Sequence, residues 1–279
     1  MRLRRAMSGG QPFLYIVLTI CAALFLLPFY LIVRNSVSTQ AETTSYNWYW
    51  FPWPPRLSSF TQLFGDPTVH MTGSMVNSAI IAVVTLVFSM LFASMAGYAL
   101  ARIPYRWRNL VFGLILATMM IPGATTFVLT YVVIGFLGGI NTLWGIIVPG
   151  LFNVFATLLF RQHYLRFPLE IEDAGKVDGL NYWGVYTRLL LPNSRGVIAA
   201  LGLLSFIGSW NGFLWPLVIG QDSSKWTVQV ALSTFLTAQT INLPELFAGA
   251  AVAIAPLVIL FLILQRYIVQ GVAMSGIKG

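Results

Sequence analysis

Charged residues are scarce in this chain of 279 residues: Asp, Glu, Lys and Arg make up 9% of it, whereas about 25% is usual in a soluble domain. Hydrophobic residues make up 57% of the chain, and its mean hydropathy is +0.78. This composition excludes an ordinary soluble protein and indicates a membrane protein. The net charge of +8 does not require nucleic acid as a partner, because anionic lipid head groups attract basic loops to the cytoplasmic membrane surface.

Cysteine and histidine, two of the usual metal ligands, are also rare. Cys21 is the only cysteine, so neither an internal disulfide nor a thiol metal site can form. His70 and His163 fall on opposite sides of the membrane in the topology given below, so they cannot share a metal. No lysine follows the glycine spacing of a phosphate-binding loop, and the paired carboxylates lie in a hydrophilic loop. We therefore expect no enzyme, no metal site and no cofactor bound by this chain.

Long apolar runs dominate the rest of the sequence. A transmembrane helix needs about 20 consecutive apolar residues. Six runs meet this length approximately: 13–33, 76–101, 110–134, 143–160, 197–219 and 247–265. We predict an all-α polytopic membrane protein with six transmembrane helices, forming a single transmembrane domain over residues 1–279. The first run has no small-residue cleavage site after it, so we expect a retained helix rather than a signal peptide.

The distribution of Lys and Arg predicts the orientation of the spans. With the N-terminus inside, every Lys and Arg except Arg34, Arg56 and Lys225 falls on the cytoplasmic side. Both termini are then cytoplasmic, and residues 34–75 and 220–246 form external loops. The loop over residues 161–196, between the fourth and fifth spans, is cytoplasmic.

This cytoplasmic loop concentrates charge, with four acidic and five basic residues between Arg161 and Arg195. The local pattern predicts a helix, a turn and a second helix. Pro168 can begin the first helix, and the acids that follow complement its dipole. Asp178 and Gly179 supply turn chemistry. We expect Asn181 to cap the second helix over residues 182–190, and Pro192 to end it.

An acid-small-small sequence in the first helix, with a glycine and a proline at fixed distances after it, resembles the Glu-Ala-Ala loop of permease subunits in bacterial ATP-binding-cassette importers. The matching residues are Asp173, Ala174, Gly175, Gly179, Leu190 and Pro192. Asp173 stands where Glu is usual, and Gly175 stands where a second Ala is usual. Further features are similar to the carbohydrate-uptake branch of this family. They are Asn77-Ser78, the Trp210-Asn211 pair and the tail Gly276-Ile277-Lys278-Gly279.

The resemblance implies that the loop forms a coupling helix, which docks in a cleft of a separate ATPase subunit. The residues implied in this coupling are Glu172, Asp173, Ala174, Gly175, Asp178, Gly179 and Pro192. Small side chains at Ala174 and Gly175 would let the partner approach the helix closely. The implied partners are a dimeric ATP-binding subunit that holds ATP and Mg, a second permease subunit, an extracytoplasmic solute-binding protein and membrane lipid. The implied location is the bacterial plasma membrane.

The predicted function is ATP-driven, binding-protein-dependent import of a sugar or oligosaccharide by alternating access. The six spans contain no Asp, Glu, His or Lys, which disfavours a carrier driven by protons or sodium. Two alternatives remain open at this stage. One is a permease of the same family for a glycerophosphodiester or a polyol, and the other is an uncoupled facilitator.

Three residues are candidates for the solute path: Pro122, Trp210 and Asn211. Pro122 lies inside a predicted span and can bend it. Asn211 would be costly against lipid, so it should either line a wet cavity or bond to another helix. The aromatic segment 46–53 has three open interpretations: a belt at the membrane interface, a docking surface for an external partner, or a stacking surface for sugar rings.

Overall fold

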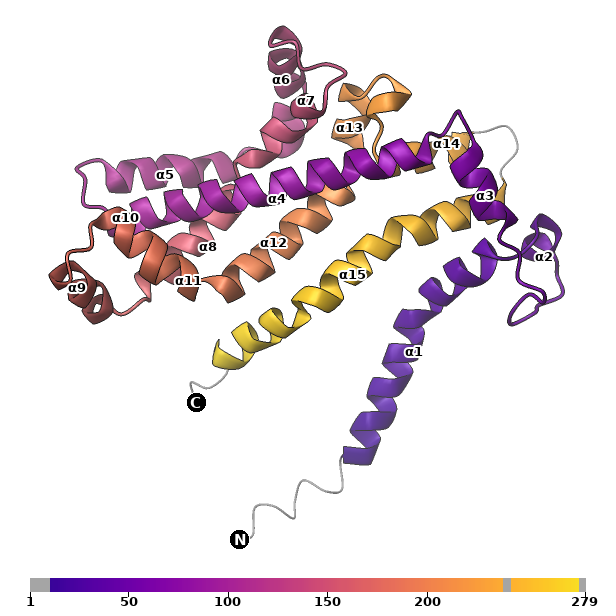
Figure 1. Ribbon diagram of the computed structural model, residues 1–279, viewed down its shortest axis with the longest axis horizontal. Helices are drawn as coiled ribbons and strands as arrows, with labels where there is room; N and C mark the ends of the chain where they lie inside the picture. Colours follow the sequence, from indigo (N-terminus) through magenta and orange to yellow (C-terminus); the bar gives the residue numbers. More distant parts are fainter. Residues whose placement is uncertain (1–10, 238–241, 276–279) are drawn as a thin grey trace. The chain divides into compact units, whose positions relative to one another are not determined.

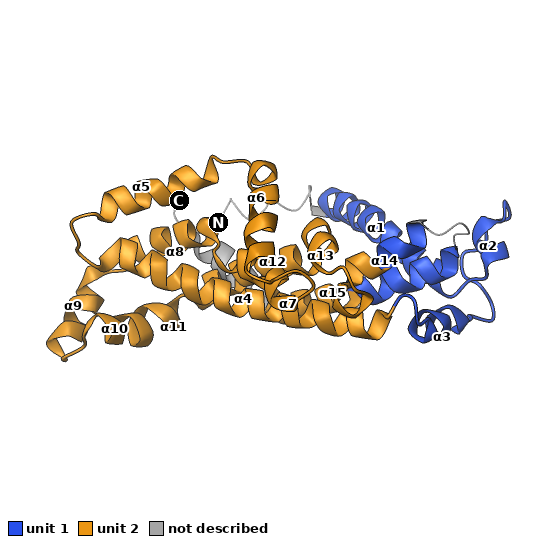
Figure 2. Ribbon diagram, turned by 90° about the horizontal axis from the view of Figure 1, so that it is seen from above, with its two compact units in different colours: residues 1–69, 232–254 blue, residues 70–231, 255–279 orange. Residues whose placement is uncertain are grey.

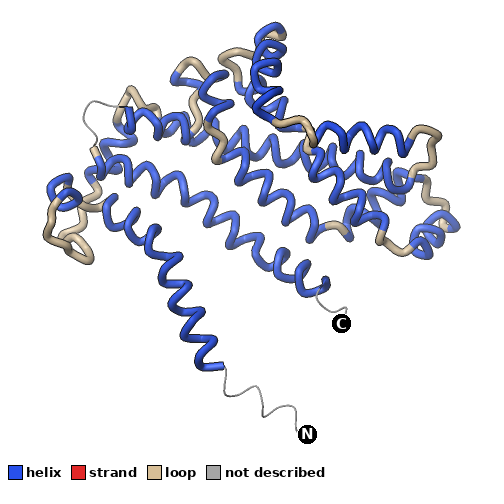
Figure 3. The backbone as a smooth tube through the Cα atoms, turned by 180° about the vertical axis from the view of Figure 1, so that it is seen from behind, coloured by secondary structure: helices blue, strands red, loops and turns tan. Residues whose placement is uncertain are grey.

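The computed structural model describes residues 11–237 and 242–275. All regular structure in these two ranges is helical (Figure 3), which confirms the predicted fold class. In chain order the principal helices are α1 (Gln11–Ser36), α2 (Gln40–Thr44), α3 (Ser58–Gly65), α4 (Met71–Arg102), α5 (Arg108–Met119), α6 (Gly123–Phe136), α7 (Leu143–Ile147), α8 (Val154–Leu165), α9 (Leu169–Val177), α10 (Tyr182–Val185), α11 (Leu191–Asn193), α12 (Arg195–Trp210), α13 (Leu214–Ile219), α14 (Val228–Thr237) and α15 (Leu243–Ser275). Short 3-10 turns cover Val148–Leu151 and Ser223–Lys225, and a π-helical turn covers Tyr186–Leu190.

Four stretches are long and apolar enough to cross a membrane: Pro12–Ser36, Met71–Arg102, Leu143–Leu165 and Leu243–Gln265. Two bent helix pairs bring the total to six if each pair counts as one span. The pair α5 and α6 is bent by 100° at residues 120–122, where Pro122 lacks the N–H that a continuous helix needs. The pair formed by 182–193 and α12 is bent by 75°.

The fifth apolar run is not one helix, so the prediction of a span over 197–219 is wrong in its second half. α12 ends at Trp210, and α13 is a separate short helix. Asn211 and Gly212 are poor helix formers and interrupt the chain between the two. Asn211 therefore sits at a helix end rather than inside a span.

The predicted external loop 220–246 also contains more structure than expected, because α14 lies within it. Val228, Val230 and Ala231 are almost fully buried. The start of α4 holds this region in place: Asn77 Nδ2 donates to the carbonyls of Ser224 at 2.8 Å and Trp226 at 3.0 Å. The helix forms because Val228, Val230 and Ala231 are buried, although the surrounding segment is polar in composition.

The chain divides into two compact units (Figure 2). One contains residues 1–69 and 232–254, and the other contains residues 70–231 and 255–279. Within the larger unit, α8 and α12 pack along α4 (Figure 1). The helices α9, α10 and α11 gather at one end of α4.

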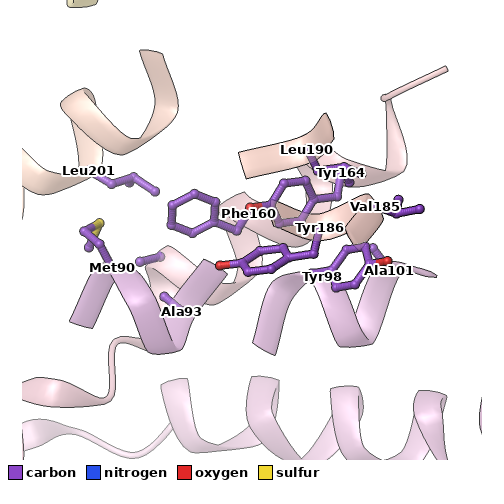
Figure 4. Packing of buried hydrophobic residues seen from close by; sticks show 11 residues of the cluster. Met90, Ala93, Tyr98, Ala101, Phe160, Tyr164, Val185, Tyr186, Leu190 and Leu201 are labelled. Carbon is purple, nitrogen blue, oxygen red and sulfur yellow. The ribbon is translucent and has the colours of Figure 1, made fainter. Parts of the chain in front are cut away.

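The core at this end of α4 is aromatic (Figure 4). Tyr98 of α4 lies 5.2 Å from Tyr186, centroid to centroid, and 6.1 Å from Tyr164 of α8. Phe160 and Tyr164 stack on each other at 5.9 Å. These rings are almost fully buried, so they join α4, α8 and the helices that follow α9 into one packed cluster.

Candidate functional site

The helix α9 occupies the position predicted for a coupling helix. It covers Leu169–Val177, directly after Pro168. Gly179 has φ +84°, a conformation that favours glycine, and it reverses the chain after α9. Asn181 caps α10, because its side chain accepts a hydrogen bond from Gly184 N at 2.8 Å. The predicted helix, turn and N-cap are therefore confirmed.

The prediction that Pro192 ends the second helix is wrong by a short distance. The helix continues from α10 through the π-helical turn, in which Leu191 N donates to Tyr186 O, and it runs past Pro192 to Asn193. Side chains then satisfy the last carbonyls: Asn193 Nδ2 donates to Leu189 O and Ser194 Oγ donates to Leu190 O, each at 2.7 Å. The 75° bend into α12 follows at Ser194.

The two faces of α9 differ in character. Its inner face carries Glu172 and Gly175, which are both buried. Its outer face carries three charged side chains, Glu170, Asp173 and Lys176, among apolar ones. The exposed apolar residues of this face are Leu169, Ile171, Ala174 and Val177. The outer face thus has the composition of a protein-binding surface.

The sequence suggested that Gly175 leaves space for a partner to approach. The structure shows that this prediction is wrong. A Cβ at Gly175 would lie 2.8 Å from Cδ1 of Leu189 and 3.1 Å from Cδ1 of Leu180, so the glycine allows α9 to pack on the helix that follows it. Of the two small residues, only Ala174 is exposed. Asp178 and Gly179 form the exposed turn beside it.

The acids of α9 have different environments. Glu172 is 3% exposed, and its Oε1 lies 2.6 Å from Nε of Arg102 at the end of α4. Burial raises the pKa of the Glu172 carboxyl above its ordinary value, and the Arg102 charge acts against this shift. Asp173 is exposed and pairs with Lys176 at 2.8 Å. The hydrogen bond that Lys176 Nζ donates to Asp173 Oδ1 raises the pKa of Lys176.

Arg102 was missed as a site residue. Its sequence context, a basic turn beside a span, indicates the cytoplasmic surface and gives no partner for the side chain. The structure shows that Arg102 also donates from Nη2 to Phe167 O at 2.6 Å, one residue before the proline that precedes α9. Two further bonds join the same face of α4 to the next helix: Tyr98 OH donates to Tyr182 O at 2.9 Å, and the hydroxyls of Ser94 and Tyr186 lie 2.7 Å apart.

A cavity of about 480 Å³ lies farther along α4, between α4, α8, α12 and α13. Its walls are mainly apolar, with polar groups from Thr85, Asn153, Ser205 and Ser209 and the indole of Trp215. Trp215 Nε1 donates to Gly145 O at 3.2 Å, which fixes the ring. None of the residues that line this cavity is charged. The cavity is suited to an uncharged ligand with hydroxyl groups.

None of the predicted path residues lines this cavity, although Trp210 and Asn211 lie next in sequence to residues that do. Trp210 is 2% exposed and stacks on Phe206 at 5.7 Å. Asn211 is exposed and accepts a hydrogen bond from Gln229 Nε2 at 3.1 Å. Pro122 is exposed at the bend between α5 and α6. Their role in the path stays a prediction, whereas Ser209 and Gly212, next to Trp210 and Asn211, do line the cavity.

The aromatic segment 46–53 folds back against the last turns of α1. Arg34 is 2% exposed, donates from Nε to Tyr49 O at 3.1 Å and lies 4.6 Å from the ring centroid of Trp48. The hydroxyl of Tyr30 donates to Trp50 O. Trp50 and Trp53 remain largely exposed.

Comparison with known proteins identifies the family. Residues 89–274 match the family described as "Binding-protein-dependent transport system inner membrane component". The chain is 36% identical over 223 residues to the arabinooligosaccharides transport system permease protein AraQ of Halalkalibacterium halodurans, covering 80% of each chain. It is 30% identical to the lactose transport system permease protein LacG of Rhizobium radiobacter, covering 92% of this chain and 93% of that one.

A solved structure has the same fold. It belongs to a bacterial ABC transporter involved in the import of the acidic polysaccharide alginate, with a TM-score of 0.82 and 23% identity, covering 94% of this chain and 98% of that one. The chain is therefore a member of the binding-protein-dependent transport system inner membrane components, and the predicted ABC importer permease family is confirmed.

Membership has direct consequences for this chain. It is a multi-pass inner-membrane transport subunit rather than an enzyme, and it works with a partner permease, an ATPase and a solute-binding protein. Within residues 11–237 and 242–275, no cluster of three His, Cys, Asp or Glu could hold a metal ion.

Proposed function

We propose that this chain is the permease subunit of an ATP-driven importer for a sugar or oligosaccharide, and that the outer face of α9 docks on the ATPase. The observation that carries the docking role is the division of α9 into a buried inner face, where Glu172 pairs with Arg102, and an exposed outer face of apolar and charged side chains. ATP and Mg would be held by the partner, a dimeric ATPase. A two-fold symmetric dimer offers two docking clefts, and the second permease would fill the other.

The proposed topology places both termini and α9 in the cytoplasm of a bacterial cell. Six crossings, with each bent pair counted as one, return the chain to the side on which it began. The basic residues at the α9 end of the spans support this orientation through the positive-inside rule. The solute-binding protein would then meet the opposite side, to which this topology assigns segment 46–53.

The proposed solute class is supported by the relatives and by the cavity beside α4. AraQ and LacG are named for arabinooligosaccharides and lactose. The hydroxyl and amide groups of Thr85, Asn153, Ser205 and Ser209 can exchange hydrogen bonds with sugar hydroxyls, and Trp215 offers a ring face. A phosphodiester would need a cation for strong binding, and the cavity has none. We propose this cavity as the contribution of the chain to the solute path.

The docking role is tested by Ala174→Trp, with Ala41→Trp in the exposed helix α2 as the matched control. Each variant is purified from membranes that also contain the candidate ATPase and the second permease, and retained ATPase and its activity in lipid are measured. We expect Ala174→Trp to lose the ATPase, because the indole obstructs the outer face of α9, and Ala41→Trp to retain it. Equal retention by both variants would refute α9 as the docking element.

A further inference from the structure

We propose that Arg102 and Glu172 form a rigid link that carries the movement of α9 into α4, so that both are positioning residues for coupling and neither belongs to the docking face. This inference depends on the proposed docking of α9 on an ATPase. The side chains meet at 2.6 Å and are 10% and 3% exposed, so a partner protein cannot reach them directly.

The guanidinium of Arg102 holds α9 at two points. Nε faces the Glu172 carboxylate in the first turn of α9, and Nη2 donates to Phe167 O just before the helix begins. An arginine with both contacts restrains the position of the helix start and its rotation, because one rigid, planar group is hydrogen-bonded at one point and ion-paired at the other. A lysine, which is a point charge, could make only one of these contacts well.

Three residues on one face of α4 make polar contacts with the helices that follow α8. Ser94, Tyr98 and Arg102 are spaced by four residues and contact Tyr186, Tyr182 and Glu172 respectively. Residues four apart in an α-helix share a face, so this row follows the helix axis for about 12 Å. The helix after Gly179 is therefore attached to α4 through Tyr182 and Tyr186, and α9 is attached to α4 through Arg102.

The same helix reaches the cavity. Thr85 and Ile81 of α4 line its wall. At 1.5 Å per residue, Thr85 lies about 25 Å from Arg102 along α4. Two ion pairs involve described residues of α9. The Arg102–Glu172 pair is buried and joins α9 to α4, whereas the Asp173–Lys176 pair is exposed and lies within α9. Movement of α9 would therefore reach the cavity through Arg102 and α4.

The test separates docking from coupling. The complete transporter, with ATPase, second permease and binding protein, is reconstituted in lipid vesicles, and the readouts are ATPase retained, ATP hydrolysed and solute taken up, with lactose and an arabinose oligosaccharide as probes. Glu172→Ala should retain the ATPase but lower the uptake per ATP by about tenfold, a size within the usual range for coupling between sites. Glu172→Gln, which keeps the size of the side chain and a polar oxygen beside Arg102, should restore most of this ratio.

Two controls keep the outcome interpretable. Thr118→Val removes an exposed hydroxyl in α5, outside α9, and should leave the ratio unchanged. The double variant Arg102→Met with Glu172→Leu removes both buried charges, so it leaves no unpaired charge to prevent folding. It should dock normally and remain uncoupled, because apolar contacts do not fix direction.

If Glu172→Ala takes up as much solute per ATP as the wild type, the proposed coupling role of the Arg102–Glu172 pair is overturned. Loss of the ATPase from Glu172→Ala, in proportion to the loss of uptake, would also overturn it, since the pair would then only shape the docking face. Failure of the wild-type chain to retain the ATPase would contradict the proposed docking itself, and this result is distinct from both.

Discussion

Gly97 of α4 and Phe160 of α8 approach so closely that a Cβ on Gly97 would lie 2.7 Å from the Cβ of Phe160. The same added atom would lie 2.9 Å from the backbone nitrogen of Arg161, which cannot move aside as a side-chain end can. This contact sets the spacing of α4 and α8 beside the aromatic cluster. Small residues at such crossings let membrane helices pack closely.

We expect Gly97→Ala to destabilise the protein by about 1–3 kcal/mol, because the methyl group forces these helices apart in a packed core. Thermal unfolding in detergent, followed by the loss of monodisperse protein, measures this effect. Gly113→Ala in α5 is the control: nothing lies within 4 Å of its added Cβ, so the change should be neutral or stabilising. Equal melting temperatures for the two variants would contradict the close contact.

Gly179 should tolerate asparagine better than alanine and should not tolerate proline. Its φ of +84° costs about 1–2 kcal/mol for an ordinary residue, and asparagine adopts such angles more readily. Proline is fixed near φ −65° and would break the turn after α9. Retained ATPase should therefore fall in the order Gly, Asn, Ala, Pro. A Gly179→Pro protein that still binds the ATPase and transports solute would show that this turn does not position α9.

Removing hydroxyl groups from the cavity should slow uptake without affecting docking. Thr85→Val and Ser209→Ala keep the shape of the wall but delete groups that can bond to a sugar. A lost hydrogen bond of this kind costs about 1 kcal/mol, so each variant should raise the half-saturating sugar concentration several-fold in cells that express the whole transporter.

The matched control is Thr118→Val in α5, whose hydroxyl is exposed and bonds to Ile115 O. It should transport like the wild type. If Thr85→Val and Ser209→Ala also transport normally, the cavity is not on the solute path.

The aromatic segment should lie at the depth of the membrane interface. The hydroxyl of Tyr30, which is inside the span Pro12–Ser36, binds the carbonyl of Trp50, so this part of the segment is level with the span. Trp side chains favour that depth. Because Cys21 is the only cysteine, Cys21→Ser gives a background in which a spin label can be placed through Trp50→Cys or Trp53→Cys.

Both labels should be more accessible to oxygen, which partitions into lipid, than to a water-soluble nickel reagent. Ser58→Cys, which lies in α3 after the aromatic segment and is exposed, is the comparison and should favour the nickel reagent. Nickel accessibility at positions 50 and 53 as high as at position 58 would remove the belt interpretation. Protection of these labels by the binding protein would instead favour a docking surface.

Much of the fold could be predicted from the sequence because its causes are local. The apolar runs specify membrane helices through their length alone. The turn at Asp178-Gly179 and the cap at Asn181 depend on the residues themselves and their immediate neighbours. The acid-small-small pattern likewise located the candidate docking helix, and the family match confirms the class of protein that this pattern predicted.

Other features depend on which residues meet across the fold. The pattern of α9 could not show that Gly175 faces Leu189, that Glu172 is buried against Arg102, or that Ala174 alone of the two small residues is exposed. The end of α12 at Trp210 and the burial of the first residues of α14 similarly departed from the hydropathy pattern.

The sequence by itself thus determined a helical membrane permease with a helix–turn–helix loop, since hydrophobic length, glycine conformation and helix capping act over a few residues. Only the tertiary structure decided which face of that loop is free and which is joined to α4. Arg102 and Glu172 are far apart in the chain, and their pairing arises from the packing of α4, α8 and the helices after α9, a set of contacts that no local pattern encodes.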